Sequence, residues 1–570
     1  MKNSSFNRRL LLLWIPPLTF LALFYFFPLG SILGISFARS ESGLAGPFME
    51  ALASPTLRNV LWFTLWQAAL STLLTLLVGL PGAYLVARYE FRGKSLLLAL
   101  TSIPFVMPTL VVAAAFNALL GPRGWVNLAL MDWFNLSQPP VQFINTFTAI
   151  LVAHIFYNLS IVLRMVGDFW SHIDPRLGQA ALTLGASPVK SLRYITLPLL
   201  TPAITAAAVL IFIFDFTSFG VILVLGGPRF ATLEVEIYYQ TISLFNLPLA
   251  SALAVIQLTC TLALTVFYTR ISERLARPLN LRPRKFTQHR LISWRSRLLA
   301  GAVIVPMVIL QTFPLVALAA RSFTRLDPER GQASPVSPGL TLAYYRELSI
   351  NRRESLFYVP PTQAIATSLG YAGATVVLAL ALGLPVAWAL SRGNGAALNR
   401  VFDPILMLPL GTSAVTLGLG FIVALNRPPL NLRSSLLLIP LAHTLVALPF
   451  VVRSLTPAIR SIRPRLRHAA ATLNATPGQV IRYVDLPLVA RALLVAAAFA
   501  FTISLGEFGA TALIARPDYP TIPIMIYRFI SQPGAMNYGQ ALALSTILMV
   551  ITAAGMLAIE RFRIAEIGEF

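Results

Sequence analysis

The chain has 570 residues, of which 56% are hydrophobic and only 11% are charged, and its mean hydropathy is +0.74. This composition is too apolar for a soluble protein of such length and favours a polytopic membrane protein. The formal net charge of +23 could indicate a nucleic-acid binder, but the basic residues lie between apolar runs, which indicates membrane topology and no nucleic-acid partner.

About twelve apolar runs follow one another along the chain, each long enough to cross a hydrocarbon core about 30 Å thick as a helix. Because a backbone in lipid must satisfy its own hydrogen bonds, the predicted fold is all-α, a polytopic integral membrane protein with about 12 transmembrane helices. The predicted spans are 10–36, 59–87, 95–120, 143–166, 199–225, 248–269, 298–320, 363–390, 402–425, 434–455, 488–514 and 538–559.

The ends of the chain and its loops are predicted from their basic residues. The first run follows Lys2, Arg8 and Arg9 and no small-residue cleavage site follows it, so it is predicted to be retained, with the N-terminus inside. The loop Arg270–Arg297 carries nine Lys and Arg against one acid and is predicted to be cytoplasmic. The loop 321–361 is then predicted to be external, although it is rich in arginine: Arg321, Arg325, Arg330, Arg346, Arg352 and Arg353.

The sequence repeats itself with an offset of 289 residues, the difference between His154 and His443. The repeat predicts a first half at 1–270, a basic cytoplasmic linker at 271–297 and a second half at 298–570. With six spans each, the halves are expected to lie parallel, so that the C-terminus is also cytoplasmic. The first half has extra residues, which fit the predicted external segment GPRGWVNLALMDWFNLSQPP.

The clearest repeat follows the fourth span of each half, where 174–198 matches 463–487. Asp174-Pro175 and Ser187-Pro188 predict the starts of two short helices, and Gly185 can adopt the left-handed corner between them. Asn474 tolerates the same corner in the second copy. Helices of about ten residues are too short to span and suit a partner's groove.

These two segments resemble the cytoplasmic EAA loop of binding-protein-dependent ABC importer permeases, and the whole chain resembles the fused permeases of the ferric iron and thiamine branch. The leading Glu of that loop is replaced by Gln179 and His468. The resemblance implies ATPase-coupling residues in both copies: Gln179, Ala180, Ala181, Gly185, Leu197 and Pro198, then His468, Ala469, Ala470, Asn474, Leu486 and Pro487.

The same resemblance implies a multi-pass protein of the cell inner membrane, surrounded by lipid, whose cargo is ferric iron or thiamine. Its expected partners are two copies of a separate ATPase and an extracytoplasmic substrate-binding protein. The chain itself has no phosphate-binding loop, since Arg88 stands where the nearest candidate needs its first glycine. It is therefore expected to be no enzyme and to carry no cofactor.

Four polar residues inside predicted spans are candidates for the translocation path. Asp215 and Glu507 are costly in apolar helices unless they face partners or water, and they could form a weakly anionic passage or pack within the bundle. His154 and His443 occupy equivalent places, for which a hydrogen-bonded structural role is favoured over a metal site. Cys260 is the only cysteine, so no cysteine-based metal site is expected.

One alternative has a different mechanism. A gradient-driven carrier of twelve spans would share the two parallel halves, and the turn RYEFRGK at 88–94 faintly resembles a loop of major-facilitator carriers. Such a carrier gives no reason for two matched loops after spans four and ten, so the ABC permease is preferred.

Overall fold

The computed structural model describes residues 3–38, 49, 53–275, 288–291, 293–326, 339–350, 359–391, 396–426 and 430–567. Much of the predicted linker 271–297 and of the predicted external loop 321–361 lies outside these residues, including Arg330, Arg352 and Arg353.

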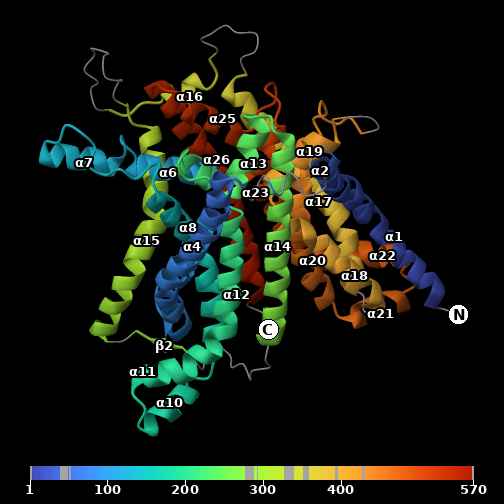
Figure 1. Cartoon of the computed structure of the whole chain (residues 1–570). Helices are drawn as coiled ribbons and strands as arrows, with labels where there is room; N and C mark the ends of the chain where they lie inside the picture. The colour runs from blue at the N-terminus through green and yellow to red at the C-terminus, as the bar shows by residue number, and fades with distance from the viewer. Residues whose placement is uncertain are drawn as a thin grey trace.

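The described residues are almost entirely helical (Figure 1). Eleven helices among them are long and apolar enough to cross a membrane, or twelve if one sharply bent pair counts as a span. The one sheet in the described part pairs β1 (Tyr89–Glu90) in parallel with β2 (His289–Arg290). The predicted all-α polytopic fold is confirmed.

The helices of the first half are α1 (Asn3–Leu21), η1 (Ala22–Phe26), α2 (Phe27–Ala38), α4 (Pro55–Arg88), α5 (Lys94–Val106), α6 (Thr109–Leu120), α7 (Trp125–Phe134), α8 (Phe147–Ile161), η2 (Val162–Val166), α9 (Gly167–Ser171), α10 (Arg176–Thr183), α11 (Pro188–Ser191), η3 (Leu192–Thr196), α12 (Leu197–Phe216), η4 (Ile222–Gly226), α13 (Leu233–Ile242) and α14 (Leu247–Leu275).

The helices of the second half are α15 (Trp294–Ser322), α16 (Ala343–Glu347), α17 (Pro361–Ser391), α18 (Ala396–Met407), η7 (Leu408–Gly411), α19 (Ala414–Ala424), α20 (Leu438–Ser461), α21 (Pro464–Thr472), α22 (Pro477–Val480), η8 (Ile481–Asp485), α23 (Leu486–Gly506), α24 (Gly509–Ile514), α25 (Ile522–Ile530) and α26 (Ala535–Ile567).

Four of the predicted spans are interrupted, which corrects the expectation of continuous helices. Span 402–425 bends by 96° before α19, and span 95–120 is divided between α5 and α6 at Pro108. Spans 199–225 and 488–514 stop at the ends of α12 and α23, and the chain turns before continuing. Proline cannot donate a backbone hydrogen bond and restricts the residue before it, which ends α5.

The internal repeat is visible in the contacts as well as in the order of helices. The backbone N–H of Leu233, the first residue of α13, donates to the Thr64 hydroxyl at 3.0 Å. At the equivalent place in the second half, the N–H of Ile522 donates to the Ser368 hydroxyl at 2.8 Å. A side chain from the second span of each half therefore caps the same helix start.

The two halves interleave in space, which the sequence did not indicate. The helices α1 and α2 pack on the second half, where Trp14 meets Phe402 with ring centroids 5.1 Å apart and the Tyr25 hydroxyl lies 2.6 Å from that of Thr412. Conversely, α15 packs on the first half, and Gln311 donates to the carbonyl of Phe156. Each half thus covers the other with its first span.

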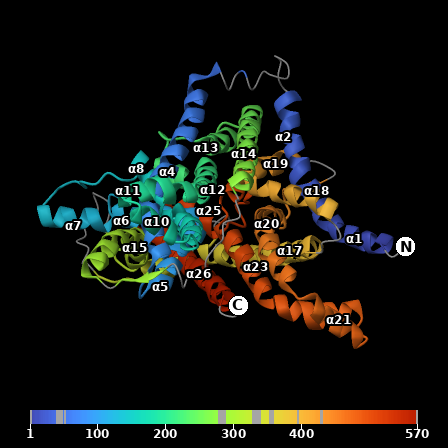
Figure 2. The ribbon, with the colours of Figure 1, turned by 90° about the horizontal axis from the view of Figure 1, so that it is seen from below.

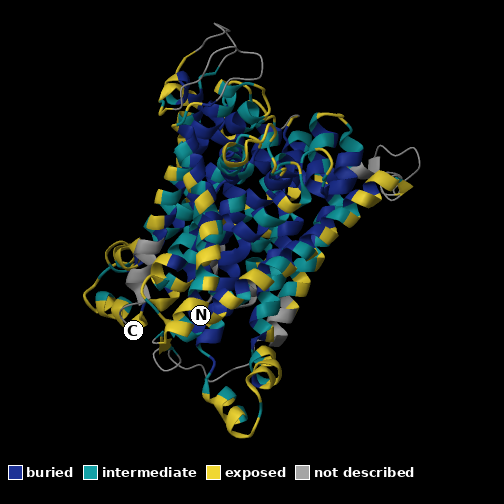
Figure 3. Cartoon of the chain, turned by 90° about the vertical axis from the view of Figure 1, so that its left-hand side faces the viewer, coloured by how far each residue is buried: buried dark blue, intermediate teal, exposed yellow. Residues whose placement is uncertain are grey.

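The two repeated segments lie toward the same end of the bundle. Helices α10 and α11 form the lowest point of the molecule in Figure 1, while α21 and α22 lie on the opposite side, toward the same lower end. The view from below confirms that they are well separated (Figure 2). Buried residues fill the middle of the bundle, and exposed residues cover the projecting helices at the lower end (Figure 3).

The extra residues of the first half form α7, which projects sideways near the upper end of the bundle (Figure 1). Its start is fixed by Asn127, which donates to the carbonyls of Gly121 and Val141 and accepts the N–H of Val141, each at 2.8 Å. The second half has no helix between α19 and α20 in its described residues. The insert is therefore an ordered addition to one half.

Candidate functional site

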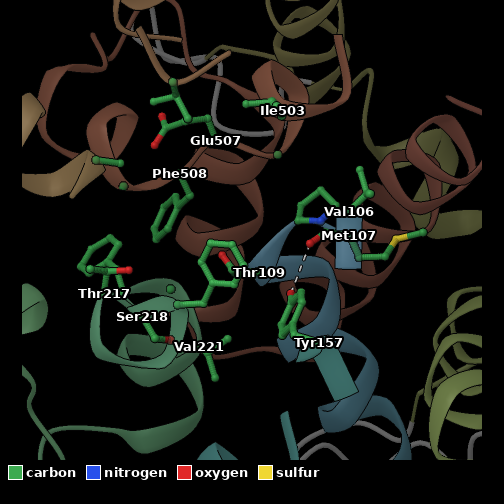
Figure 4. A pocket seen from close by; sticks show the side chains of 18 of the residues that line it. Val106, Met107, Thr109, Tyr157, Thr217, Ser218, Val221, Ile503, Glu507 and Phe508 are labelled. Atoms are coloured by element: carbon green, nitrogen blue, oxygen red, sulfur yellow. Dashed lines mark hydrogen bonds between the residues drawn. The ribbon is translucent and has the colours of Figure 1, made fainter. Parts of the chain in front are cut away.

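A cavity of about 390 Å³ lies between the two halves, where the interrupted helices meet. The breaks at 107–108, 217–219, 413 and 507–508 all contribute to its wall. Irregular backbone at membrane depth is tolerated where it lines a cavity or is buried in protein. Side chains from the first half (Thr109, Tyr157, Ser218) and the second half (Ile503, Glu507, Phe508) face the same space (Figure 4).

In the first half, the cavity wall holds His154 and Asp215. The His154 Nδ1 lies 2.9 Å from the Ser71 hydroxyl and 3.5 Å from Asp215 Oδ1, and its Nε2 lies 2.9 Å from the Ser218 hydroxyl. Asp215 Oδ1 also accepts a hydrogen bond from Asn158 at 2.7 Å. Both side chains are buried, so the structure brings together the predicted acid and the predicted histidine of this half.

In the second half, Glu507 lines the cavity and His443 is buried against it. The His443 Nε2 lies 3.2 Å from Glu507 Oε2 and 2.9 Å from the Thr511 hydroxyl, and its Nδ1 lies 2.7 Å from the Ser504 hydroxyl. His443 is not among the residues that form the cavity wall. Both ring nitrogens of each histidine thus have hydroxyl partners, as a structural role requires.

A third acid in the wall, Glu234, was missed by the sequence analysis. It lies in the first turn of α13, outside every predicted span, so no hydropathy signal pointed to it. Its side chain accepts hydrogen bonds from Gln257 and from Ser413 at the break before α19. The described residues of the cavity wall include these three acids and neither Lys nor Arg.

Four aromatic side chains from equivalent positions form a cluster between the halves, here called the aromatic cluster: Phe219, Tyr238, Phe508 and Tyr527. The rings of Phe219 and Phe508 stack across the interface with centroids 5.5 Å apart and an interplanar angle of 21°. Each is backed by the tyrosine of its own half, at 5.3 and 5.5 Å. Because the tyrosines belong to α13 and α25, near the upper end in Figure 1, the cluster covers the cavity on that side.

The segments 174–198 and 463–487 have the same backbone corner. Gly185 and Asn474 have φ of +85° and +61°, the left-handed conformation expected for both. The N–H of Ala186 donates to the carbonyl of Ala181, and that of Ala475 to the carbonyl of Ala470, each closing the preceding helix. The difference between glycine and asparagine therefore leaves the corner unchanged.

The helix restarts after each corner as expected, but it does not end where the sequence suggested. Ser187 and Thr476 cap the restart by accepting N–H groups at 3.3 and 3.4 Å. The new helix then runs through a π-helical turn, η3 or η8, directly into the long α12 or α23. The expected second short helix is therefore the lower end of a long one. Each π-helical turn ends two positions before a proline, Pro198 or Pro487, which lacks a backbone donor.

The predicted coupling residues lie at the surface of these segments. Ala181 and Ala470 are half-buried and the other ten are exposed. Sequence analysis missed two leucines, Leu184 and Leu473, which stand at equivalent corner positions and are 88% and 84% exposed. The sequence does show that a leucine stands immediately before Gly185 in the first segment and immediately before Asn474 in the second, and this repetition could have identified both residues.

Comparison with known proteins gives matches over most of the chain. Residues 77–277 match the family described as binding-protein-dependent transport system inner membrane component. The thiamine transport system permease protein ThiP of Escherichia coli is 28% identical over 499 residues, covering 84% of this chain and 85% of that protein. ThiP of Brucella abortus is also 28% identical, over 526 residues, covering 91% and 90%.

A relative from Sinorhizobium fredii, the probable ABC transporter permease protein y4fN, is 26% identical over 526 residues. A solved bacterial ABC transporter involved in the import of alginate aligns with a TM-score of 0.42 at 19% identity, covering 48% of this chain and 99% of that one, a likeness too loose to support an argument. Over most of its length, and with eleven or twelve candidate spans, the chain is therefore similar to permeases of ABC importers, and its residues 77–277 match the inner-membrane component family of binding-protein-dependent transport systems.

Proposed function

We propose that this permease imports thiamine, an aromatic cation, through the cavity between its halves. The observation that carries the proposal is the cavity wall itself, with Asp215, Glu234 and Glu507 among phenyl and phenol rings and no Lys or Arg in its described residues. Its volume of about 390 Å³ suits a ligand of drug-like size. The names of the ThiP relatives support the same cargo.

Ferric iron, the other expected cargo, is less well supported. A hard metal ion needs several oxygen ligands around one point. In the part of the chain that the structure describes, no group of three or more His, Cys, Asp or Glu side chains is arranged to hold a metal ion. Aromatic rings beside a carboxylate are instead the surroundings that favour an organic cation.

Energy comes from a separate ATPase, and an external substrate-binding protein delivers the cargo. Two ATPase copies are proposed, one on segment 174–198 and one on 463–487, with the N- and C-termini on the same, cytoplasmic side. The exposed Leu184 and Leu473 support this docking, because large apolar side chains so exposed at equivalent positions indicate a partner surface. The permease itself contributes geometry and selectivity and breaks no bond.

The proposed mechanism couples these loops to the cavity through continuous helices. Segment 188–216 is one helix from the restart after the corner to the cavity wall, and 477–506 is its equivalent. Closure of the ATPase pair would therefore move both helices and the residues at their upper ends as rigid bodies. Separation of the halves at the aromatic cluster then gives access from the upper side.

Two measurements test the cargo and the energy source. The cognate substrate-binding protein, titrated with thiamine and with ferric iron, should bind thiamine.

Uptake into vesicles containing permease and ATPase should require ATP and persist when the proton gradient is collapsed. Uptake by the permease alone, driven by a gradient, would instead support the secondary carrier.

Replacement of Phe219 and Phe508 together by alanine is expected to open the cavity toward the upper side. The two rings stack directly on each other across the interface, and their loss leaves a gap between the halves at this place in the closed state. Passive efflux of thiamine from preloaded proteoliposomes without ATP should rise several-fold, by roughly the factor expected for removing a steric barrier of about 1–2 kcal/mol.

The matched control is Trp62→Ala, which removes a large side chain that is 67% exposed on α4, away from the cavity wall. Efflux in the double variant no faster than in this control would show that the aromatic cluster does not close the path.

A further inference from the structure

Each half has one cavity acid beside its histidine, but the acid stands at a different position of the repeat in the two halves. With the offset of 289 residues, Asp215 corresponds to Ser504, and Ser218 corresponds to Glu507. Each half therefore has one carboxylate and one hydroxyl at this pair of positions, in opposite order. Both acids contact the imidazole of their own half, at 3.5 Å in the first and 3.2 Å in the second.

The carboxylate of the second-half acid, Glu507, already accepts hydrogen bonds from the helix that follows it. Glu507 Oε1 accepts the backbone N–H of Ala510 at 2.9 Å, and Oε2 accepts the N–H of Thr511 at 3.1 Å and its hydroxyl at 2.6 Å. A carboxylate that accepts first-turn N–H groups stabilises the start of a helix and is itself stabilised by them. The Glu507 side chain thus accepts N–H groups in the first turn of α24 from the position before the N-cap residue Phe508.

The first-half acid keeps one oxygen unused. Asp215 Oδ1 accepts from Asn158, whereas Oδ2 is buried and has no hydrogen-bond partner among the described residues. The residue is 1% exposed and lines the cavity. A buried carboxylate oxygen without a partner is costly, and a cationic or hydrogen-bond-donating group brought to this part of the cavity wall would lower that cost.

The third acid does not compete for this role. Both oxygens of Glu234 accept hydrogen bonds, one from Gln257 and one from Ser413. Among the three described acids of the wall, only Asp215 therefore has a carboxylate oxygen without a hydrogen-bond partner. Aromatic residues Tyr157, Phe214 and Phe219 belong to the same wall.

We infer that Asp215 forms the cation subsite of the cavity, pairing through Oδ2 with the positive charge of an organic aromatic cation, while Glu507 has a structural role. One free carboxylate oxygen among aromatic faces can pair with a delocalised organic cation but supplies too few oxygens for a hard metal ion. The cargo thus meets an asymmetric site whose charge recognition lies in the first half. This inference rests on the proposed import of thiamine and specifies its contact.

The test uses the purified permease–ATPase complex in lipid nanodiscs without the binding protein. Equilibrium binding of radiolabelled thiamine is compared with that of its neutral isostere, in which the thiazolium nitrogen is replaced by carbon. Asp215→Asn keeps an acceptor for Asn158 and is expected to weaken thiamine binding about tenfold or more, with the isostere unchanged. The matched control is Asp403→Asn, because Asp403 lies on α18 outside the residues that line the cavity, 3.6 Å from Arg453, and both affinities should stay at their wild-type values. Glu507→Gln tests the structural role of that residue separately and should lower the melting temperature of the complex.

Three results would overturn the inference: thiamine affinity unchanged in Asp215→Asn, equal weakening of thiamine and the isostere, or no thiamine binding by the wild-type complex. The proposed function fails separately, when the binding protein does not take up thiamine. A complex that binds and transports thiamine independently of Asp215 would contradict the subsite and leave the cargo assignment intact.

Discussion

Replacement of Leu184 and Leu473 together by aspartate is expected to abolish association with the ATPase and, with it, ATP-driven transport. Each leucine projects from a helix corner held by a left-handed residue, so the substitution changes the surface and leaves the corner intact. Burying a leucine in a partner's groove is worth about 2 kcal/mol, and a buried aspartate adds a desolvation cost. The affinity at each loop should therefore fall by roughly 100-fold or more.

The measurement is co-purification of the ATPase with the permease, followed by transport in proteoliposomes. Leu340→Asp is the matched control, because that leucine is 82% exposed near α16, at the other end of the bundle, and its replacement should leave ATPase binding unchanged. The single variants measure the two loops separately. Normal co-purification of the double variant would refute docking at these corners.

The features of the fold that follow local rules could be predicted from the sequence. The number of spans follows from the lengths of apolar runs, and the corners follow from Gly185 and Asn474, two residue types that tolerate positive φ. The capped restarts at Ser187 and Thr476 follow from the Ser-Pro and Thr-Pro pairs.

The features that sequence analysis missed depend on tertiary contacts. Hydropathy cannot distinguish a straight apolar helix from one that breaks for two or three residues, so the breaks that build the cavity wall were read as continuous spans. The exchange of α1 and α15 between halves has no compositional signal, because lipid-facing and helix-facing surfaces are equally apolar. The unequal roles of Asp215 and Glu507 depend on which N–H groups surround each carboxylate.

An ion pair between the half-buried Arg467 and the buried Asp485 ties the second loop to the bundle, and the first loop has no such charge pair at the corresponding positions. The Arg467 Nε donates to Asp485 Oδ1 at 2.7 Å, and its guanidinium lies 5.5 Å from the ring centre of Trp388 on α17. At the corresponding positions the first loop has Gly178 and Thr196. A charge pair between α21 and η8 therefore connects the second loop to its half. We expect this loop to transmit the motion of the ATPase to the bundle more stiffly than the first loop does.

Replacement of Asp485 by alanine is expected to be destabilising because it removes the carboxylate that pairs with Arg467. Breaking a fully buried pair costs roughly 3–5 kcal/mol. The Arg467 side chain keeps 25% of its surface exposed, so a smaller cost, about 2 kcal/mol, is expected here. The melting temperature of the permease should fall, and ATPase stimulation by loaded binding protein should decline more than ATPase binding, since the leucine surface remains.

The matched control is Thr196→Ala at the equivalent position of the first loop, which removes a hydroxyl and no charge. Its stability and stimulated ATPase rate should stay close to those of the wild type. If Asp485→Ala behaved like this control, the ion pair would contribute neither stability nor coupling. If instead ATPase binding were lost in parallel with stimulation, the pair would hold the docking surface in shape, and the stiffness argument would fail.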